Sequence, residues 1–337
     1  MVTRMTPRQH SDFYIAGCDP NGGIYHYRIE NGIKFVAKYD VDRPMWITFD
    51  PNDNEYLYIL LREYTENLNS GVTRCKVAPD GSLYGFEIPV LSEGRCACHA
   101  SISGNYLYLV NYLSGNVLAY DKKCLSRGSV FRDAHEGHGV HPTRQEAPHT
   151  HFVRESPDGK YIFCVDLGVD KIIVYDHELH FVSEASVPAG EGCRHLDYSP
   201  DGKFVYCANE LGSSVSVFAY ENGRLNLLET YKALPEGFNG QNTAAAIRVS
   251  PDGKYLFVSH RGHDSVCAFD IVDGCKLENP EWTKIAGSSP RDFNFIENYM
   301  VVANEKSKVT VLKVDGKHLE KLNYELDVPG ALCVAVR

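Results

Sequence analysis

One pattern of apolar and polar positions recurs along the chain. Its clearest copies are SPDGKYIFCVDLGVDKIIVYD from Ser156, SPDGKFVYCANELGSSVSVFAY from Ser199 and SPDGKYLFVSHRGHDSVCAFDI from Ser250. Each copy holds two strand-length runs rich in Val, Ile, Tyr and Phe, bounded by Gly, Asp, Asn and Ser, which predicts half-buried β-strands. The Pro-Asp-Gly step predicts a tight turn, because proline presets φ, aspartate caps locally and glycine accepts positive φ. Helical periodicity is nearly absent, so the pattern predicts an all-β fold.

Four weaker copies of this unit bring the total to seven. They begin at Ser11, Asn52, Ser103 and Ile296. The first strand position after the turn then falls on Asp12, Tyr56, Tyr106, Tyr161, Phe204, Tyr255 and Tyr299. A period of about 40 to 50 residues with four short strands per unit is typical of a β-propeller. We therefore predict a seven-bladed β-propeller with four-stranded antiparallel blades.

The two ends of the chain complement each other. The first copy enters its hairpin at about residue 12, which leaves too little chain before it for an inner strand. The segment VPGALCVAVR, residues 328–337, has the apolar alternation of an inner strand and no hairpin partner after it. We expect this segment to complete the first blade, so that the ring has no free edge. The prediction is one domain over residues 1–337 without an internal linker.

Polar residues gather at one predicted mouth of the propeller channel. The start of each inner strand and the end of the following strand share a rim, because the two strands are antiparallel. The opposite rim carries the stereotyped Pro-Asp-Gly-Lys turns, so we place function at the polar rim. The candidate catalytic residues are Glu210, His149, His151, Arg194 and Arg261. The candidate substrate-binding residues are Asn111, Asp166, Asn209, His260, Arg291, Asn304 and Glu305. Other inner-strand starts at this rim are His99, His195 and Asp292.

The pattern singles out these candidates to different degrees. Arg194, Glu210 and Arg261 each break the repeat with a charge at a position facing the mouth, which favours function. An asparagine recurs at one alignment position in three blades, at residues 111, 209 and 304, which favours a repeated structural hydrogen bond from blade to blade. A histidine at a strand start is more often bonded to a loop carbonyl than catalytic. The sequence does not choose between His149 and His151.

Two stretches carry residue types that bind metals. The segment DAHEGHGVHPTRQEAPHTH, residues 133–151, holds five histidines in the longest interval between copies. Its irregular spacing and the lack of an HExxH or cysteine-rich pattern disfavour zinc and favour a lid or substrate-contacting loop over the mouth. Cys96, Cys98 and His99 lie close together, but no second ligand cluster stands nearby in sequence. We predict no metal and no cofactor.

Composition narrows the classes of partner and compartment. The net charge of −10 and the pI near 5.8 argue against a nucleic-acid or membrane partner, so an anionic ligand needs its own arginines. The first residues, MVTRMTPRQHSDF, have no signal-peptide core, and no stretch approaches about eighteen consecutive apolar residues. The eleven cysteines form no CxxC pair, and Cys164, Cys207 and Cys267 lie in apolar runs as small hydrophobes. We expect a cytoplasmic protein with reduced thiols.

Several consecutive segments carry a family resemblance. RQEAPHTHFVRESPDGKYIFCVDLGVDKIIVYD, GCRHLDYSPDGKFVYCANELGSSVSVF, NTAAAIRVSPDGKYLFVSHRGHDSVCAFD and SPRDFNFIENYMVVANEKSKVTVL resemble the lactonase family of seven-bladed propellers. That family includes propeller-type 6-phosphogluconolactonases and fungal carboxymuconate cyclases. The resemblance implies metal-independent hydrolysis of a sugar lactone, with 6-phosphogluconolactone of the pentose phosphate pathway as the first candidate. The family's active-site His, Arg, Glu and Arg fall on His149 or His151, Arg194, Glu210 and Arg261.

Lactone hydrolysis needs an activated water, a stabilised oxyanion and a proton for the leaving ring oxygen. By this resemblance Glu210 acts as general base or positions one, Arg194 and Arg261 hold the phosphate or oxyanion, and one of the two histidines donates the proton. Glu305 adds a second carboxylate near the mouth. Two alternatives stay open: a carboxymuconate-type lactonising cyclase, and a non-catalytic propeller that binds a protein or an anionic metabolite. The Arg, Glu, His and Asn side chains of the rim favour a small polar anionic ligand, which the resemblance implies is an anionic sugar lactone. The oligomeric state is not predicted.

Overall fold

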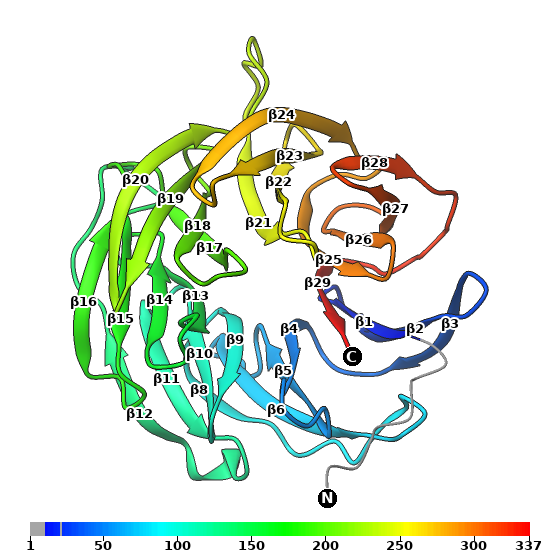
Figure 1. Ribbon diagram of the computed structural model, residues 1–337. Coiled ribbons are helices and arrows are strands. Elements are labelled where there is room, and N and C mark those ends of the chain that lie inside the picture. Colours follow the sequence, from blue (N-terminus) through cyan, green and yellow to red (C-terminus); the bar gives the residue numbers. More distant parts are fainter. Residues whose placement is uncertain (1–10, 21) are drawn as a thin grey trace, which may run out of the picture.

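The computed structural model describes residues 11–20 and 22–337. Seven antiparallel β-sheets stand side by side in a ring (Figure 1). In this part of the chain the helical structure is limited to one 3₁₀ turn, η1 (Leu125–Arg127), and no helix is long and apolar enough to cross a membrane. The predicted seven-bladed β-propeller is confirmed. The prediction that a signal peptide is absent concerns residues that lie mostly outside the described ranges.

Each blade has four strand positions, counted outward from the channel. Blade one contains β29 (Ala331–Val336), β1 (Ser11–Gly17), β2 (Gly23–Ile29) and β3 (Ile33–Tyr39). Blade two contains β4 (Pro44–Phe49), β5 (Tyr56–Leu61), β6 (Asn69–Val77), β7 (Leu83–Tyr84) and β8 (Val90–Arg95). Here β7 and β8 both pair with β6 and share the outer position. Blade three contains β9 (Ala97–Ser103), β10 (Tyr106–Asn111), β11 (Asn116–Asp121) and β12 (Ser129–Ala134).

The other four blades follow the same plan without exception. Blade four contains β13 (Thr150–Glu155), β14 (Ile162–Asp166), β15 (Lys171–Tyr175) and β16 (Phe181–Ser186). Blade five contains β17 (Cys193–Tyr198), β18 (Phe204–Asn209), β19 (Ser214–Glu221) and β20 (Arg224–Lys232). Blade six contains β21 (Thr243–Val249), β22 (Tyr255–Arg261), β23 (Ser265–Val272) and β24 (Lys276–Lys284). Blade seven contains β25 (Pro290–Ile296), β26 (Tyr299–Asn304), β27 (Thr310–Asp315) and β28 (His318–Lys321).

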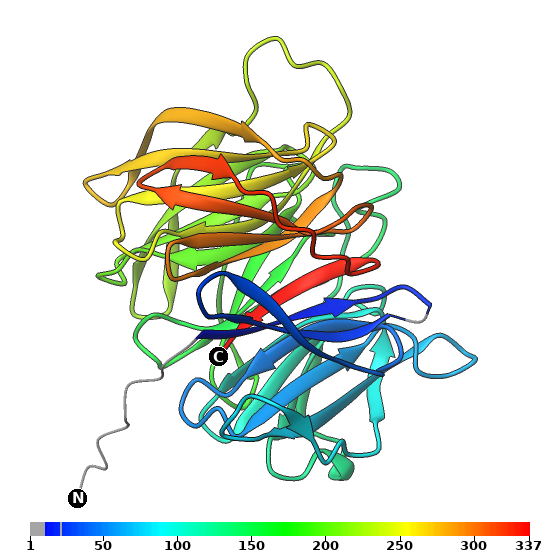
Figure 2. The same ribbon diagram turned by 90° about the vertical axis from the view of Figure 1, so that its right-hand side faces the viewer.

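The C-terminal strand closes the ring. β29 pairs antiparallel with β1, and the two strands lie side by side (Figure 2, red and blue). The Cys18 N–H donates to the Gly330 carbonyl (2.9 Å), and Asn294 Nδ2 of blade seven donates to the Val334 carbonyl (3.1 Å). β29 therefore bonds both to blade one and to its neighbour. The predicted completion of the first blade by residues 328–337 is confirmed.

Apolar side chains between neighbouring blades form the core. Phe163 of β14, for example, packs in one cluster with Leu196 and Val205 of blade five. Cys164, Cys207 and Cys267 are fully buried within such clusters, which bears out their interpretation as small hydrophobes. All eleven cysteines are free thiols. Burial of this kind replaces disulfides as the source of stability.

The Ser-Pro-Asp-Gly turns share one hydrogen-bond pattern. In blade four, Ser156 Oγ donates to Asp158 Oδ1 (2.6 Å) and accepts from the Tyr161 N–H (3.0 Å). The same two bonds recur in the turns that begin at Ser199 and Ser250. The glycines of these turns have φ between +69° and +75°. The tight turn predicted from the sequence is confirmed, with the aspartate as its local cap.

We expect Gly253→Ala to lower the free energy of unfolding by about 2 kcal/mol. Gly253 has φ +75°, and an added Cβ would lie 2.4 Å from Pro200 Cγ. Gly104, in the corresponding turn of blade three, has φ +55° but no atom within 4 Å of its Cβ position. Gly104→Ala therefore carries only the conformational penalty and serves as the matched control. Urea unfolding measures both variants, and equal losses would contradict a role for the Pro200 contact.

The inner strands of the blades line the channel. We call the end where they begin the near mouth and the end where they finish the distal mouth. Beside the near mouth every inner strand has a register shift. Such a bulge leaves one residue unpaired and re-aims its side chain. The unpaired residues in six blades are Leu332, Met45, Cys98, His151, Arg194 and Arg291.

Candidate functional site

Glu210 lies at the centre of a buried charge cluster at the near mouth. It follows the last residue of β18, and its side chain is almost completely buried. Glu210 Oε2 accepts a hydrogen bond from Arg194 Nε (2.8 Å). The same oxygen forms an ion pair with Arg261 Nη2, also at 2.8 Å. Glu210 Oε1 accepts from Arg144 Nη2. Three arginines from three different segments therefore hold one carboxylate.

The cluster keeps its groups charged. Burial alone would raise the pKa of Glu210, but Arg261 and Arg194 hold it well below its usual value. Burial and the neighbouring charge of Arg261 lower the pKa of Arg194 to about 9, so this side chain is still charged at neutral pH. Both carboxylate oxygens of Glu210 are already held by guanidinium groups. The geometry therefore suits Glu210 better to holding arginines than to accepting a proton.

A second ion pair lies beside this cluster. Arg291, the unpaired residue of the β25 bulge, has its Nη1 3.5 Å from Glu305 Oε2. Burial would raise the pKa of Glu305, but Arg291 and then Arg261 lower it. Four guanidinium groups thus face two carboxylates at the near mouth. The positive excess suits an anionic ligand, as expected from the sequence.

Of the two candidate histidines, His151 belongs to the charge cluster. As the unpaired residue of the β13 bulge it lies edge-on to Tyr112 and His195, with ring centroids 5.6 and 5.3 Å away. Burial, and then the charge of Arg194, hold the pKa of His151 well below its usual value, so its ring is neutral. His151 Nδ1 is buried without a hydrogen-bond partner among the described residues.

Two further buried groups of the cluster lack partners. Arg194 Nη1 and Arg261 Nε are both buried and unpaired within the described residues. An unpaired buried N–H costs about 1–3 kcal/mol, so such groups need a reason to persist. Together with His151 Nδ1 they supply three unused polar atoms beside Glu210. This set is the strongest structural sign of a ligand site in the molecule.

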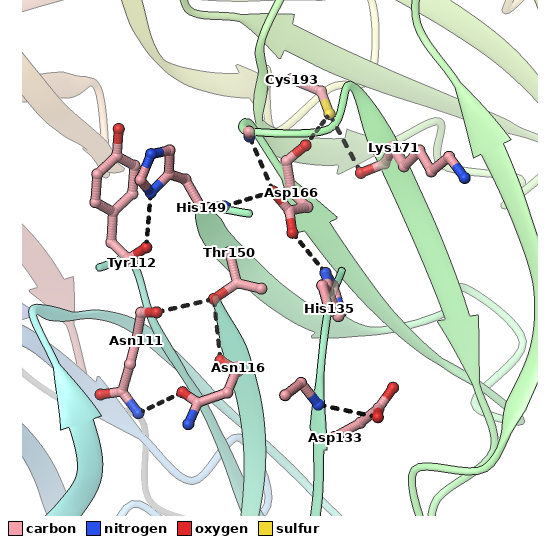
Figure 3. Close-up of polar contacts among 12 residues, drawn as sticks. Asn111, Tyr112, Asn116, Asp133, His135, His149, Thr150, Asp166, Lys171 and Cys193 are labelled. Carbon is pink, nitrogen blue, oxygen red and sulfur yellow. Dashed lines mark hydrogen bonds and ion pairs between the residues drawn. The ribbon is translucent and has the colours of Figure 1, made fainter. Parts of the chain in front are cut away.

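His149 has no hydrogen bond to Glu210 among the described residues, and its ring lies beside Tyr112 (Figure 3). Its ring stacks on Tyr112, with centroids 4.4 Å apart and planes 10° from parallel. Its Nδ1 donates to the Tyr112 carbonyl (3.0 Å), and its Nε2 lies 3.3 Å from Glu146 Oε1. These contacts fix the entry to β13 and engage both ring nitrogens. The structure thus separates the two histidines that the sequence left together.

Asp166 fastens the histidine-rich segment instead of facing the mouth. Its Oδ1 accepts from the backbone N–H groups of His149 (2.7 Å) and Gly168 (2.9 Å). Its Oδ2 lies 2.6 Å from His135 Nδ1 (Figure 3). His135 Nε2 lies 2.9 Å from the Tyr175 hydroxyl. Across residues 11–20 and 22–337 no three His, Cys, Asp or Glu side chains gather as a metal site. The segment is tied down by hydrogen bonds.

The three recurrent asparagines bond to the loops that follow their strands. Asn111 Nδ2 donates to Asn116 Oδ1 (2.9 Å), Asn209 Nδ2 to Ser214 Oγ (2.8 Å), and Asn304 Nδ2 to the Lys308 carbonyl (2.7 Å). All three asparagines are fully buried. These bonds lie within one blade, whereas the recurrence predicted a bond between blades. Asn111 Nδ2 also donates to the Ser92 carbonyl of blade two (2.9 Å), but Asn209 and Asn304 make no such bond among the described residues, and their Oδ1 atoms have no partner there. They stand behind the charge cluster and hold its loops.

His260 also stands behind the charge cluster. It is fully buried, and its Nδ1 lies 3.0 Å from Asn242 Nδ2. Burial, with a smaller contribution from His263, lowers the pKa of His260 to about 3, so the ring is neutral. It follows Ser259 on β22 and immediately precedes Arg261. Its contact therefore steadies the strand end from which Arg261 reaches Glu210.

Three inner-strand residues expected at the rim lie deeper in the channel. His195 and His99 pack against each other (5.4 Å between ring centroids) and against Trp46 and Phe152. Asp292 accepts hydrogen bonds from Arg248 Nη2 and from the Val334 N–H, on the distal-mouth side of this aromatic layer. The rim placement of these three residues was wrong because the bulges give the near mouth to the preceding residue.

The sequence did not single out Arg144. It lies in the histidine-rich segment, and its Nη2 contacts Tyr112 Oη (3.4 Å) as well as Glu210. Its side chain is 36% exposed, compared with 2% for Arg194. The sequence had led us to expect this segment as a lid over the mouth. An arginine within such a lid was the sequence feature that could have identified Arg144 as a site residue. The Tyr112 ring contacts both His149 and His151.

Comparisons with known proteins agree with this architecture. The family model "Lactonase, 7-bladed beta-propeller" matches residues 12–336. An uncharacterised protein of Staphylococcus aureus strain N315 is 35% identical over 306 residues, covering 86% of this chain and 88% of the relative. The solved periplasmic gluconolactonase PpgL of Pseudomonas aeruginosa is 28% identical with a TM-score of 0.89, covering 97% of this chain and 99% of that one. The chain therefore belongs to the lactonase family of seven-bladed β-propellers.

Proposed function

We propose that the protein hydrolyses a phosphorylated sugar lactone, with 6-phosphogluconolactone as the first candidate substrate. The observation that carries this proposal is the near-mouth cluster, with its positive excess and its unpaired polar atoms on Arg194, Arg261 and His151. A phosphate or an oxyanion would supply the missing acceptors. Family membership and a gluconolactonase among the similar structures support a lactone as substrate. The proposal includes action in the pentose phosphate pathway and in the cytoplasm.

In the proposed mechanism, Glu210 organises the oxyanion site. Its carboxylate holds Arg194 and Arg261 in place, and their unpaired N–H groups stabilise the charge that develops on the lactone carbonyl oxygen. Preorganised donors of this kind are worth about a hundredfold or more in rate. This role differs from the two expected from the resemblance, which were to act as a general base or to position one. The physical reason is that arginines hold both carboxylate oxygens.

The neutral ring of His151 is proposed to move the proton. A neutral imidazole can take a proton from the attacking water and return it to the leaving ring oxygen. Water adds to the carbonyl carbon, the ring C–O bond breaks, and the products are the carboxylate and the alcohol of the opened sugar. Arg144 and Arg291 are proposed to hold the phosphate, since both lie beside the cluster and Arg144 is partly exposed.

The first test compares two lactones under one assay. We expect kcat/KM for 6-phosphogluconolactone to exceed that for unphosphorylated glucono-1,5-lactone by about tenfold to a hundredfold, because only the former supplies a dianion to the arginines. A pH-stat measures acid release from both substrates, after subtraction of spontaneous hydrolysis. Arg291→Ala should narrow this preference, whereas Arg224→Ala on the outer strand β20 should leave it unchanged.

The outcomes of this comparison separate the parts of the proposal. Equal kcat/KM for the two lactones would refute a phosphate site and keep the lactonase assignment. A preference for the unphosphorylated lactone would make the activity that of a gluconolactonase, as named for the similar Pseudomonas aeruginosa structure. No rate above background with either substrate would overturn the proposal as a whole.

A further inference from the structure

The distal mouth of the channel holds a cavity of about 590 Å³. It lies among the ends of the inner strands, at the opposite end of the channel from Glu210. The aromatic layer of Trp46, His99, Phe152 and His195 lies between the cavity and the near-mouth cluster. Small-molecule sites have volumes of about 300–1,000 Å³, so the cavity is large enough to take a metabolite.

Two arginines line this cavity, and their carboxylate partners have little capacity left. Arg154 Nη1 donates to Asp197 Oδ1 (2.9 Å), while Asp197 Oδ2 accepts from the Val249 N–H (2.7 Å). Arg248 Nη2 donates to Asp292 Oδ1 (2.9 Å), while Asp292 Oδ2 accepts from the Val334 N–H (2.9 Å). Each aspartate is thus shared between a guanidinium and the backbone, and each arginine keeps donors to spare.

The spare donors face the cavity. Among the described residues Arg154 Nε and Nη2 and Arg248 Nη1 have no hydrogen-bond partner, and the Arg154 side chain is 42% exposed although it lines a concave site. Ser101 Oγ, also in the cavity lining, is buried and unpaired. After burial, Arg248 and Arg154 contribute most to holding the pKa of His99 well below its usual value. The charges of both guanidinium groups therefore reach His99, which lines the cavity.

Aromatic rings hold both arginines ready. The Arg154 guanidinium lies over the Tyr198 ring at 4.7 Å from its centroid, and the Arg248 guanidinium lies 5.9 Å from the Phe293 centroid. Such stacking orients a guanidinium before any ligand arrives. Trp46 and Phe152 add apolar surface to the wall. The cavity thus offers charged donors on one side and flat apolar surfaces on another.

We propose that the distal mouth is a binding site for a monocarboxylate with a flat apolar group. Arg154 and Arg248 would bind the carboxylate together with Ser101 Oγ, and the ring or other planar part would lie against Trp46 and Phe152. At most one negative charge fits, because Asp197 and Asp292 match the charges of the two arginines and the carboxylate of Glu155 also lines the cavity. The site is separate from the proposed lactonase site and does not depend on its activity.

Trp46 gives this proposal a direct readout. The chain has two tryptophans, so Trp282→Phe leaves Trp46 as the sole tryptophan reporter, at the cavity wall. Titration of that variant with sodium benzoate should change its fluorescence in a saturable way. Arg154→Ala and Arg248→Ala in the same background should each weaken the apparent affinity by about tenfold. Sodium acetate and benzyl alcohol, which lack the ring and the charge respectively, should bind at least about tenfold more weakly.

Two control variants test whether benzoate binds at the distal mouth. Arg224→Ala, an exposed arginine on β20, should leave the benzoate titration unchanged. Arg261→Ala should do so too, because Arg261 belongs to the near mouth. Arg154→Lys keeps the charge and is the second variant if Arg154→Ala fails to fold; it should bind benzoate more weakly than Arg154 does, since a lysine lacks the planar fork. A non-saturable response, unchanged affinity in the Arg154 and Arg248 variants, or loss of binding in Arg261→Ala would overturn the proposal.

Discussion

Replacing Glu210 with glutamine is expected to lower kcat/KM for 6-phosphogluconolactone by about a hundredfold or more. The substitution keeps the side-chain shape and removes the charge that holds Arg194 and Arg261. Because those guanidinium groups are buried, they lose both their partner and their fixed positions, and the unfolding free energy should fall by about 3 kcal/mol. Background-corrected kinetics and thermal unfolding measure the two effects.

Glu305→Gln is the matched control for this variant. Glu305 is also a carboxylate of the near mouth, but its side chain is 30% exposed and it pairs with Arg291 at a longer 3.5 Å. We expect a loss of less than about tenfold in kcat/KM. If Glu210→Gln kept activity within a few-fold of the wild type, or if the two variants lost the same amount, Glu210 would not be the organiser of the site.

Arg144 can distinguish the role proposed for Glu210 from the role of general base. Removing this arginine takes away one of the charges that lower the pKa of Glu210. If Glu210 accepted the proton, Arg144→Ala would make it a stronger base and would not slow the chemical step. If Glu210 anchors the arginines, the loss of one member of the cluster slows that step. Because Arg144 is also proposed to hold the phosphate, the test uses unphosphorylated glucono-1,5-lactone: a drop in kcat is the expected result, and an unchanged or raised kcat would restore the role of base.

The repeat made the fold predictable from sequence alone. Turns such as the one from Ser156 to Tyr161 are built by residues close in sequence, and local hydrogen bonds fix their geometry. The closing strand was predictable for a similar reason, because residues 328–337 had the pattern of a strand and lacked a partner in sequence. Strand order follows from the pattern within one copy of the unit, blade number from the number of copies, and ring closure from the incomplete copies at the two chain ends.

The site depended on features that the alternation of strand residues does not encode. A regular strand at residues 149–155, without a bulge, gives no reason to prefer His149 or His151. The same assumption of regular inner strands in blades five and seven places His195 and Asp292 at the rim. The bulges at His151, Arg194 and Arg291 turn these side chains toward the near mouth. Arg144 was missed for a different reason: its contact with Glu210 spans 66 residues, and no local pattern announces such a contact.

Replacing His151 with phenylalanine is expected to lower kcat by about a hundredfold or more while KM changes little. Phenylalanine keeps a ring that can lie edge-on to Tyr112 and His195, but it cannot accept or donate a proton. The free energy of unfolding should change by less than about 1 kcal/mol, because His151 Nδ1 has no hydrogen bond to lose. Steady-state kinetics and urea unfolding test both statements.

The pH profile and the neighbouring histidine complete this test. Because the pKa of His151 lies well below its usual value, the ring stays neutral as the pH falls, and wild-type kcat/KM should stay level from about pH 8 to pH 6. His149→Phe should lose less than about tenfold in kcat but about 1 kcal/mol of stability, since it gives up its bond to the Tyr112 carbonyl. An acid limb near pH 6.5, or a larger loss of kcat in His149→Phe, would transfer the proton-moving role away from His151.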